Sequence, residues 1–289
     1  MKPTIDHVLL TRFNLPTPGV ESLVRAKEGW LRDRQQLFER YCLPAVLGQT
    51  VTGFSWIIYF DTQSPPWLKE RVADLSSDGS FTPLYRDSVP RWQLLADLRA
   101  VTGAGADILL TTNVDNDDAV SLDFVERIQQ QAVDGNRCAI YLAHGLIRAG
   151  DELFRRRDDH NAFVSVGESW TDPVTCWADW HNRLGETMAV RSVGGPPAWL
   201  QVVHGGNVSN RVRGTRVRPE PFRDLFVHGL DGVTAPTRRA MAVDLAIRAP
   251  MRGGRELARA IVKKAVLRVG GKQGLNRIKV LAAGRSRVE

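Results

Sequence analysis

The sequence predicts an α/β protein built on a mainly parallel sheet. Over roughly the first 145 residues, apolar runs of strand length alternate with segments in which apolar residues recur at helical spacing. The chain of 289 residues is 43% hydrophobic and 25% charged, a composition that excludes the disordered and collagen-like classes. In open α/β sheets ligands bind at the carboxyl ends of the strands, so polar residues that follow apolar runs are the candidates for function.

The predicted elements follow from local composition. The run 54–60 is dense in aromatic and β-branched residues and stops at Asp61, as a buried strand does. Pro44 is expected to kink or shorten the helix over 33–47, and Ser121 is expected to cap the helix over 121–131. The expected strands are 7–11, 54–60, 81–85, 107–112, 138–142, 163–166 and 199–204, and the expected helices are 33–47, 65–75, 91–102 and 121–131.

Charge divides the chain into a body and a tail. Residues 1–237 hold 25 Lys+Arg and 29 Asp+Glu, whereas residues 238–289 hold 14 Lys+Arg and 3 Asp+Glu. We therefore expect one α/β domain over 1–237 and a basic, helical tail over 238–289.

Cysteine usage and hydropathy indicate a reducing compartment. Cys42, Cys138 and Cys176 are an odd number, are far apart in sequence and form no C-x-x-C pair. The N-terminus lacks the apolar core of a signal peptide, and no stretch reaches the ~18 apolar residues of a spanning helix. We expect a cytoplasmic protein.

An acidic tetrapeptide, Asp115-Asn116-Asp117-Asp118, follows the predicted strand over 107–112. Three carboxylates within four residues repel one another unless a cation lies between them. Mg²⁺ and Mn²⁺ prefer oxygen ligands and share their coordination shell with substrate phosphates. The motif therefore predicts a divalent-metal and diphosphate site at Asp115 and Asp117. The alternative is an acidic surface turn, stabilised by the N-terminus of the helix that follows.

An ordered set of short motifs accompanies these acids. The motifs are 11–14, Arg34 with 37–39, 41–44, Gln49, 54–56, 60–61, 112–118 and 199–207. In this order the chain resembles the bacterial rhamnosyltransferase family, and the resemblance extends to about residue 215 without covering the basic tail. It implies a GT-A fold and the transfer of a sugar, with rhamnose as the first candidate, from a nucleoside-diphosphate sugar to a glycan or glycolipid acceptor. The implied cofactor is Mn²⁺ or Mg²⁺.

The resemblance also implies the residues that bind the nucleotide sugar. In a GT-A fold the loop after the first strand and an acid after the second strand hold the nucleotide. The expected set is Thr11, Arg12, Phe13, Asn14, Asp61, Arg91, Asn113, Asp115 and Asn116. Residues 1–145 then form the nucleotide-sugar half of the domain and residues 146–237 its acceptor half. The alternatives for Asp61 and Arg12 are a plain strand-end residue and a solvated charge.

A late histidine is the third expected metal ligand. His204 closes an apolar strand, and its neutral imidazole is suited to complete a shell begun by Asp115 and Asp117. GT-A enzymes commonly bring a late histidine to the metal, and His204 resembles that histidine in its position. The alternative is a buried histidine that hydrogen-bonds the backbone.

Sugar transfer with inversion needs a base that takes the proton of the acceptor. The carboxylates considered are Glu168, Asp172 and Asp179, and the expected catalytic residues are Asp179 and Glu168. Asp179 lies among Trp177, Trp180 and His181, which we expect to bind the acceptor. The alternative is a structural Trp/Asp/His loop.

The basic tail has the residue spacing of an amphipathic helix. Arg252, Arg255, Arg259 and Lys263 recur at helical spacing, with Leu257, Ile261 and Ala265 on another face. This pattern favours contact with the anionic inner face of the cell membrane, and no nucleic-acid signature accompanies it. A plain solvated helix is the alternative.

Two other functions remain as alternatives. One is an aspartyl-type phosphatase or phosphotransferase, because Asp115-Asn116-Asp117 also resembles the nucleophile motif of those enzymes. The other is a non-catalytic, membrane-associated binding protein.

Overall fold

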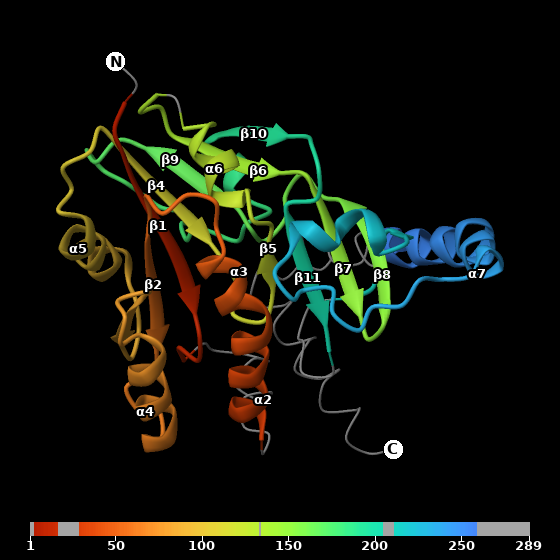
Figure 1. Cartoon of the computed structure of the whole chain (residues 1–289). Coiled ribbons are helices and arrows are strands. Elements are labelled where there is room, and N and C mark those ends of the chain that lie inside the picture. Colours follow the sequence, from red (N-terminus) through yellow and green to blue (C-terminus); the bar gives the residue numbers. More distant parts are fainter. Residues whose placement is uncertain (1–2, 17–28, 133, 205–210, 259–289) are drawn as a thin grey trace.

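Two sheets flanked by helices make up the described part of the chain, as Figure 1 shows. The computed structural model describes residues 3–16, 29–132, 134–204 and 211–258. The larger sheet has seven strands in the order β10-β6-β9-β4-β1-β2-β3, and the smaller has five in the order β12-β8-β7-β11-β5. The predicted α/β fold class is confirmed. The motif residues 205–207 and the tail residues 259–289, with Arg259, Ile261, Lys263 and Ala265, lie outside the described residues.

The elements have the following bounds. The larger sheet contains β1 (Ile5–Arg12), β2 (Ser55–Phe60), β3 (Thr82–Tyr85), β4 (Ile108–Asn113), β6 (Cys138–Leu142), β9 (Ser165–Glu168) and β10 (Ala189–Val193). The smaller sheet contains β5 (Ala119–Val120), β7 (His144–Ala149), β8 (Glu152–Arg157), β11 (Trp199–Val203) and β12 (Thr215–Arg216). The α-helices are α2 (Trp30–Leu37), α3 (Leu43–Leu47), α4 (Pro66–Leu75), α5 (Arg91–Thr102), α6 (Phe124–Gln129) and α7 (Arg238–Val243).

The larger sheet is mainly parallel, as predicted. β1 pairs in parallel with β2 and β4, β2 with β3, and β6 with β10. β9 is the exception, because it runs antiparallel to both β4 and β6. Its predicted position at 163–166 is two residues early.

Both faces of the central strands are covered, which explains why most residues of β1, β2, β4 and β6 are buried. Successive side chains of a strand point to opposite faces, so Val8 and Leu9 enter different core clusters. On one face Leu94 and Leu98 of α5 cover the cluster that contains Val8. On the other face the cluster of Leu9 includes residues of α3, α4 and α6.

The helix predicted over 33–47 reaches its predicted end, whereas the cap predicted for the helix over 121–131 is wrong. A π-helical turn at Phe38–Cys42 precedes Pro44, and the helix continues as α3 to Leu47, so Pro44 does not shorten it. Proline cannot donate to the carbonyl four residues back, and a turn widened by one residue accommodates this defect. Ser121 does not cap α6, because its hydroxyl donates to Asp123 Oδ1 (2.6 Å) and α6 begins only at Phe124.

The smaller sheet was largely missed at the sequence level. β7 and β8 form an antiparallel hairpin, and β11 adds to β7 in parallel. β8 contains three arginines in succession, so its alternation of apolar and polar residues is weak. In the part of the chain that the structure describes, no helix is long and apolar enough to cross a lipid bilayer.

Candidate active site

The acidic tetrapeptide lies at the carboxyl edge of the larger sheet. Leu10 of β1 lies opposite Asn113 of β4, and the backbone N–H of Val114 extends this pairing by donating to Leu10 O (3.0 Å). Thr11 reinforces the junction, since its hydroxyl donates to Val114 O (2.8 Å). The loop after β1 and the acids after β4 are therefore neighbours, as the resemblance to GT-A enzymes implies.

Asp117 connects three distant segments of the chain. Its Oδ2 accepts from His204 Nε2 (2.9 Å), 87 residues later, and from Arg34 of α2 (2.5 Å). Asp117 is buried. Burial alone raises the pKa of its carboxyl, but the hydrogen bond from His204 and the charge of Arg34 outweigh it and hold the pKa below its ordinary value. Asp117 is therefore ionised, and its carboxylate is held by the guanidinium of Arg34 and the imidazole of His204.

Asn116 fixes the acidic turn against the loop after β1. Its side-chain amide donates to Phe13 O (2.7 Å) and Arg12 O (3.1 Å), and its Oδ1 accepts from Arg34 (3.0 Å). These bonds use its hydrogen-bonding groups within the protein. Its predicted contact with the nucleotide sugar stays a prediction.

Asp115 and Asp118 lack the compensation that Asp117 has. Burial, followed by the charges of the neighbouring aspartates, raises the pKa of Asp115 and raises that of Asp118 well above the ordinary value. Asp118 Oδ1 accepts from Val202 N (2.8 Å), whereas its buried Oδ2 has no hydrogen-bond partner among the described residues. The same acids raise the pKa of the buried Cys42 thiol, after burial itself. The cluster is short of positive charge.

Of the three predicted metal ligands, Asp115, Asp117 and His204, the last two are in direct contact. Among the described residues no group of three or more His, Cys, Asp or Glu side chains is assembled to hold a metal ion. The chemistry of the donor set nevertheless fits a hard divalent cation, because Asp115 and Asp117 supply carboxylate oxygens beside the imidazole of His204. Arg34 now neutralises Asp117, so a cation at this carboxylate competes with that guanidinium.

The indole of Trp177 is connected to the acidic turn through Asn113. The Arg12 guanidinium lies over the ring of Trp177, 4.0 Å from its centroid. Trp177 Nε1 donates to Asn113 Oδ1 (2.8 Å), and Asn113 Nδ2 donates to Asp115 Oδ1 (3.2 Å). His181 is near enough for its charge to lower the pKa of Asp115 against the larger effect of burial. Predicted donor-side and acceptor-side residues therefore meet here.

The remaining nucleotide candidates fall into three groups. Asn14 and Asp61 are joined, since Asp61 N donates to Asn14 Oδ1 (3.0 Å). Thr11 and Phe13 are buried, and Phe13 packs in the core. Arg91 is bound elsewhere, because its guanidinium donates to Pro173 O (3.0 Å) and pairs with Asp172.

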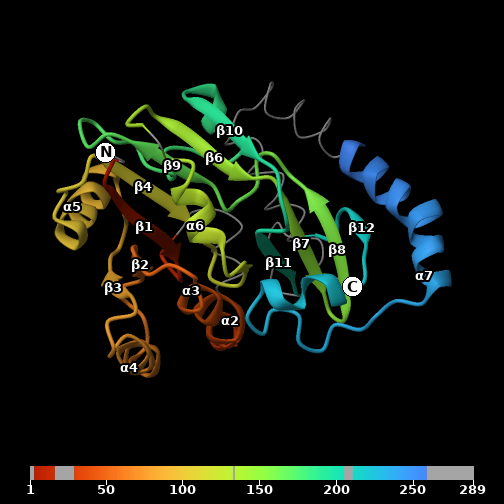
Figure 2. The ribbon, with the colours of Figure 1, turned by 45° about the horizontal axis from the view of Figure 1, so that its top comes forward.

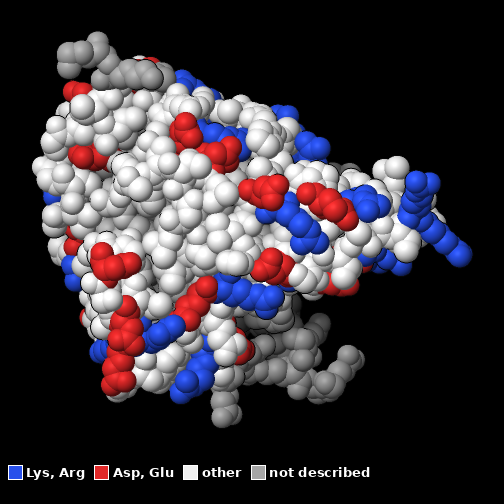
Figure 3. Space-filling model, in the orientation of Figure 1, with Lys and Arg blue, Asp and Glu red and all other residues white. Residues whose placement is uncertain are grey.

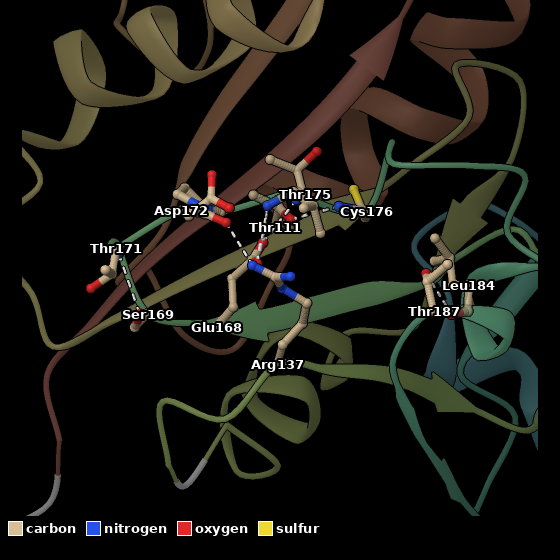
Figure 4. A network of polar contacts seen from close by, with 12 residues as sticks. Thr111, Arg137, Glu168, Ser169, Thr171, Asp172, Thr175, Cys176, Leu184 and Thr187 are labelled. Carbon is tan, nitrogen blue, oxygen red and sulfur yellow. Dashed lines mark hydrogen bonds and ion pairs between the residues drawn. The ribbon is translucent and has the colours of Figure 1, made fainter.

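The side chain of Glu168 takes part in a network of hydrogen bonds, which Figure 4 shows. Glu168 lies opposite Leu109, at the amino end of β4 and away from the acidic turn. Its buried carboxylate pairs with Arg137 (2.7 Å) and accepts from the backbone N–H groups of Val174 and Thr175. These bonds hold the segment after β9 against the sheet. The catalytic role predicted for Glu168 stays a prediction.

Asp179 and Trp180 occupy the loop between Trp177 and His181. Asp179 Oδ1 accepts from Trp180 N (2.7 Å), and Arg183 lies 3.8 Å from Asp179 Oδ2. His181 is exposed, and its Nδ1 lies 2.5 Å from His160 O. A carbonyl only accepts, so Nδ1 carries a proton, and Nε2 offers a lone pair in the neutral form of the ring.

A pocket of about 380 Å³ opens beside the pair of Asp117 and His204. It is lined by Trp30, Asp33, Arg34, Gln36, Leu37, Arg40 and His204. Its volume is in the range of small-molecule sites. Sequence reasoning used Arg34 only as part of the family motif and did not identify it as a site residue. The spacing of Trp30, Arg34 and Leu37 on one helix was the available signal.

Acidic and aromatic residues at the carboxyl edge of a parallel α/β sheet, beside a pocket, are typical of enzymes that bind nucleotides. The chain belongs to the family described as "Putative rhamnosyl transferase", whose model matches residues 6–216. It is therefore a glycosyltransferase, as predicted. A search of curated proteins gave no significant match.

Several solved structures are distantly similar to this chain. S. aureus TarS in complex with UDP-GlcNAc is 6% identical, with a TM-score of 0.42; the match covers 72% of this chain and 62% of that one. The inositol-1-phosphate CTP transferase from T. maritima is 10% identical, with a TM-score of 0.36, and the match covers 70% of this chain and 90% of that one.

Proposed function

We propose that this glycosyltransferase moves a sugar, with rhamnose as the first candidate, from a nucleoside-diphosphate sugar to a glycan or lipid-linked glycan. The observation that supports the proposal most strongly is the clamp on Asp117. Arg34 and His204, from opposite parts of the chain, converge on one buried carboxylate beside a pocket. Burying charged groups costs desolvation free energy, and such groups are found together mainly at functional sites.

The diphosphate is proposed to bind at this clamp with Mn²⁺ or Mg²⁺. Asp115, Asp117 and His204 would hold the cation, which when bound neutralises the charge that develops on the departing diphosphate. With a cation bound at Asp117, the ion pair of Arg34 would no longer be needed to neutralise that carboxylate. The Arg34 guanidinium, which lies at the wall of the pocket, would then be available to the phosphate oxygens. Arg34 is proposed as a diphosphate-binding residue on this basis.

The base and ribose are proposed to lie along the loop after β1. Arg12, at the end of β1, stacks on Trp177, and Asn14, in the loop after β1, accepts a hydrogen bond from the backbone of Asp61, which follows β2. A flat cation and an indole suit a nucleobase, and a carboxylate suits a ribose hydroxyl. Asn113 holds Trp177 in place through its Nε1.

The acceptor is proposed to bind on the side of Trp177, Trp180 and His181. Asp179 is the predicted base. The tautomer of His181 adds a second candidate, because its free Nε2 lone pair can take a proton from an acceptor hydroxyl.

The two bases are separated by the pH dependence of the rate. We expect the variant that removes the base to lower kcat about 100-fold or more and to abolish the acidic limb of the pH profile. Asp179→Asn and His181→Asn are compared, with His228→Asn, an exposed histidine paired with Asp231, as the control. If neither variant changes that limb, neither residue is the base.

The donor is identified by a screen. Nucleoside diphosphates and nucleotide sugars, including UDP and TDP forms, are added with and without Mn²⁺ while the melting temperature is followed. A ligand that binds the native state raises this temperature. We expect one base to stabilise the protein and to require the cation. Hydrolysis of p-nitrophenyl phosphate without nucleotide binding would instead indicate the phosphatase, and the absence of both would indicate the non-catalytic binding protein.

A further inference from the structure

The helix at the far edge of the smaller sheet has an unusual orientation of its faces. It begins as α7, passes through a π-helical turn at Asp244–Arg248 and continues to residue 258. Figure 2 shows it beyond β8 and β12, at the side of the molecule remote from α4 and α5. The π-turn precedes Pro250, as the other π-turn precedes Pro44, so the helix is continuous through a proline.

The polar side of this helix faces the protein. Asp244 is buried and pairs with Arg252 (2.7 Å), which also donates to Gly214 O (2.8 Å) and lies over the ring of Phe154. One turn further, Glu256 binds Arg156 (3.2 Å) and Arg213 (3.0 Å). The helix is thus anchored to β8 and to the segment before β12 by ion pairs and hydrogen bonds.

The apolar side faces outward. Leu245 is 66% exposed, Ile247 55%, Met251 52% and Leu257 64%. With Val243, these residues are five of the eight large hydrophobic side chains that are exposed in the described part of the chain. A helix of a globular protein normally buries its apolar stripe and exposes its polar face. Here the arrangement is inverted, so the apolar stripe is available to something outside the domain.

The charges on the outward side are all positive. Arg238, Arg239, Arg248 and Arg255 are exposed, whereas both acids of the described helix, Asp244 and Glu256, are engaged by arginines. Figure 3 shows blue and white atoms on the projecting end of the molecule. Residues 259–289 add nine Lys+Arg and one Glu to the sequence that follows. An apolar stripe rimmed by arginines matches an anionic lipid interface, with acyl chains below charged headgroups.

We propose that the helix over 238–258 lies in the surface of an anionic membrane with its apolar stripe inserted. Ile247, Met251 and Leu257 enter the acyl boundary, while Arg248 and Arg255 contact the headgroup phosphates. The basic face alone does not bind; the apolar stripe supplies the larger part of the attraction. This inference is independent of the sugar-transfer chemistry, although it would bring the enzyme to lipid-linked acceptors.

Flotation of the full chain with vesicles tests the proposal. Vesicles of phosphatidylcholine alone are compared with vesicles that also contain phosphatidylglycerol, for the wild type and for Ile247→Ser/Leu257→Ser. The wild type is expected to float with the anionic vesicles more strongly than with the neutral ones, and Ile247→Ser/Leu257→Ser to bind the anionic vesicles at least about tenfold more weakly. Arg248→Gln/Arg255→Gln is expected to lose the preference for anionic lipid.

The matched control is Leu47→Ser/Trp92→Ser, which removes two apolar side chains that are 53% and 70% exposed on other helices. It should float like the wild type, and nucleotide binding should be unchanged in every variant. Equal flotation of the wild type and Ile247→Ser/Leu257→Ser would overturn the proposal. So would a wild-type dimer in sedimentation that becomes a monomer in that variant, since a second copy would then cover the stripe.

Discussion

At the residue scale, charge balance around the acidic turn decides how the site works. Asp115, Asp117 and Asp118 follow one another closely, and Arg34 is the cation that bonds to Asp117. Burial and mutual repulsion raise the pKa of Asp115 and Asp118 because this one guanidinium does not neutralise all three. A divalent cation would supply the missing charge.

Arg34→Gln tests whether the guanidinium serves the ligand as well as Asp117. We expect the affinity for a nucleoside diphosphate in Mn²⁺ to fall about tenfold or more, because a charge-assisted contact to phosphate is lost. Isothermal titration calorimetry measures the change. Arg32→Gln, on the same helix but stacked on Trp67, is the control and should bind normally. Equal affinities in both variants would restrict Arg34 to a structural role.

His7 predicts a specific pH dependence of stability. Its imidazole is buried, with Nε2 bonded to Thr112 (2.9 Å), and burial lowers the pKa of His7 to about 3. In the unfolded chain the ring takes up a proton below pH 6.5, whereas the folded chain keeps it neutral. The contribution of the neutral His7 ring to the free energy of unfolding is therefore fully present above pH 6.5 and is lost as the pH falls toward 3.

His7→Gln isolates this contribution. The free energy of unfolding in urea is measured at pH 8 and pH 5 for both proteins. We expect the wild type to lose about 2 kcal/mol more than the variant over this interval, since each pKa unit of difference corresponds to about 1.4 kcal/mol. An equal loss would show that His7 does not titrate differently in the folded and unfolded chains.

At the element scale, the success of sequence reasoning followed the strength of the periodic pattern. β1, β2 and β4 were predicted because they are buried on both faces and read as continuous apolar runs. The hairpin of β7 and β8 was missed because its outer strand ends in three arginines. The helix was predicted to extend to residue 47, but the π-helical turn before Pro44 was missed because local composition does not reveal it.

The contact of β7 with β11 yields a prediction of stability. A Cβ at Gly145 would lie 2.0 Å from the ring of Trp199, whose Nε1 donates to Leu142 O (2.9 Å). We expect Gly145→Ala to cost at least about 2 kcal/mol, because the indole cannot move without losing this bond. Urea unfolding measures the change. Gly53→Ala, where a Cβ meets no atom within 4 Å, is the control, and equal effects would contradict the packing described here.

At the scale of the whole molecule, the predicted partnership of Asp117 and His204 is present. They lie 87 residues apart in sequence and within 2.9 Å in space. Their approach was expected from the resemblance to GT-A enzymes, although β4 belongs to the larger sheet and β11 to the smaller one. Arg34 could not be placed in this way, because which face of α2 meets the acids depends on packing. The outward apolar face of the helix over 238–258 could not be predicted either. A sequence pattern shows that a helix has two faces, but not which of them packs against the rest of the protein.

Asp117 is proposed to bind a divalent cation that in turn binds the diphosphate of the donor. The affinity of UDP and TDP is measured by calorimetry with Mn²⁺ and with EDTA, for the wild type, Asp117→Asn and the control Asp123→Asn. Asn keeps the shape of Asp117 but removes its charge. We expect the wild type and Asp123→Asn to bind one of these nucleotides only with Mn²⁺, and Asp117→Asn to lose at least about 100-fold in affinity while remaining folded. Undiminished Mn²⁺-dependent binding by Asp117→Asn would contradict the claim.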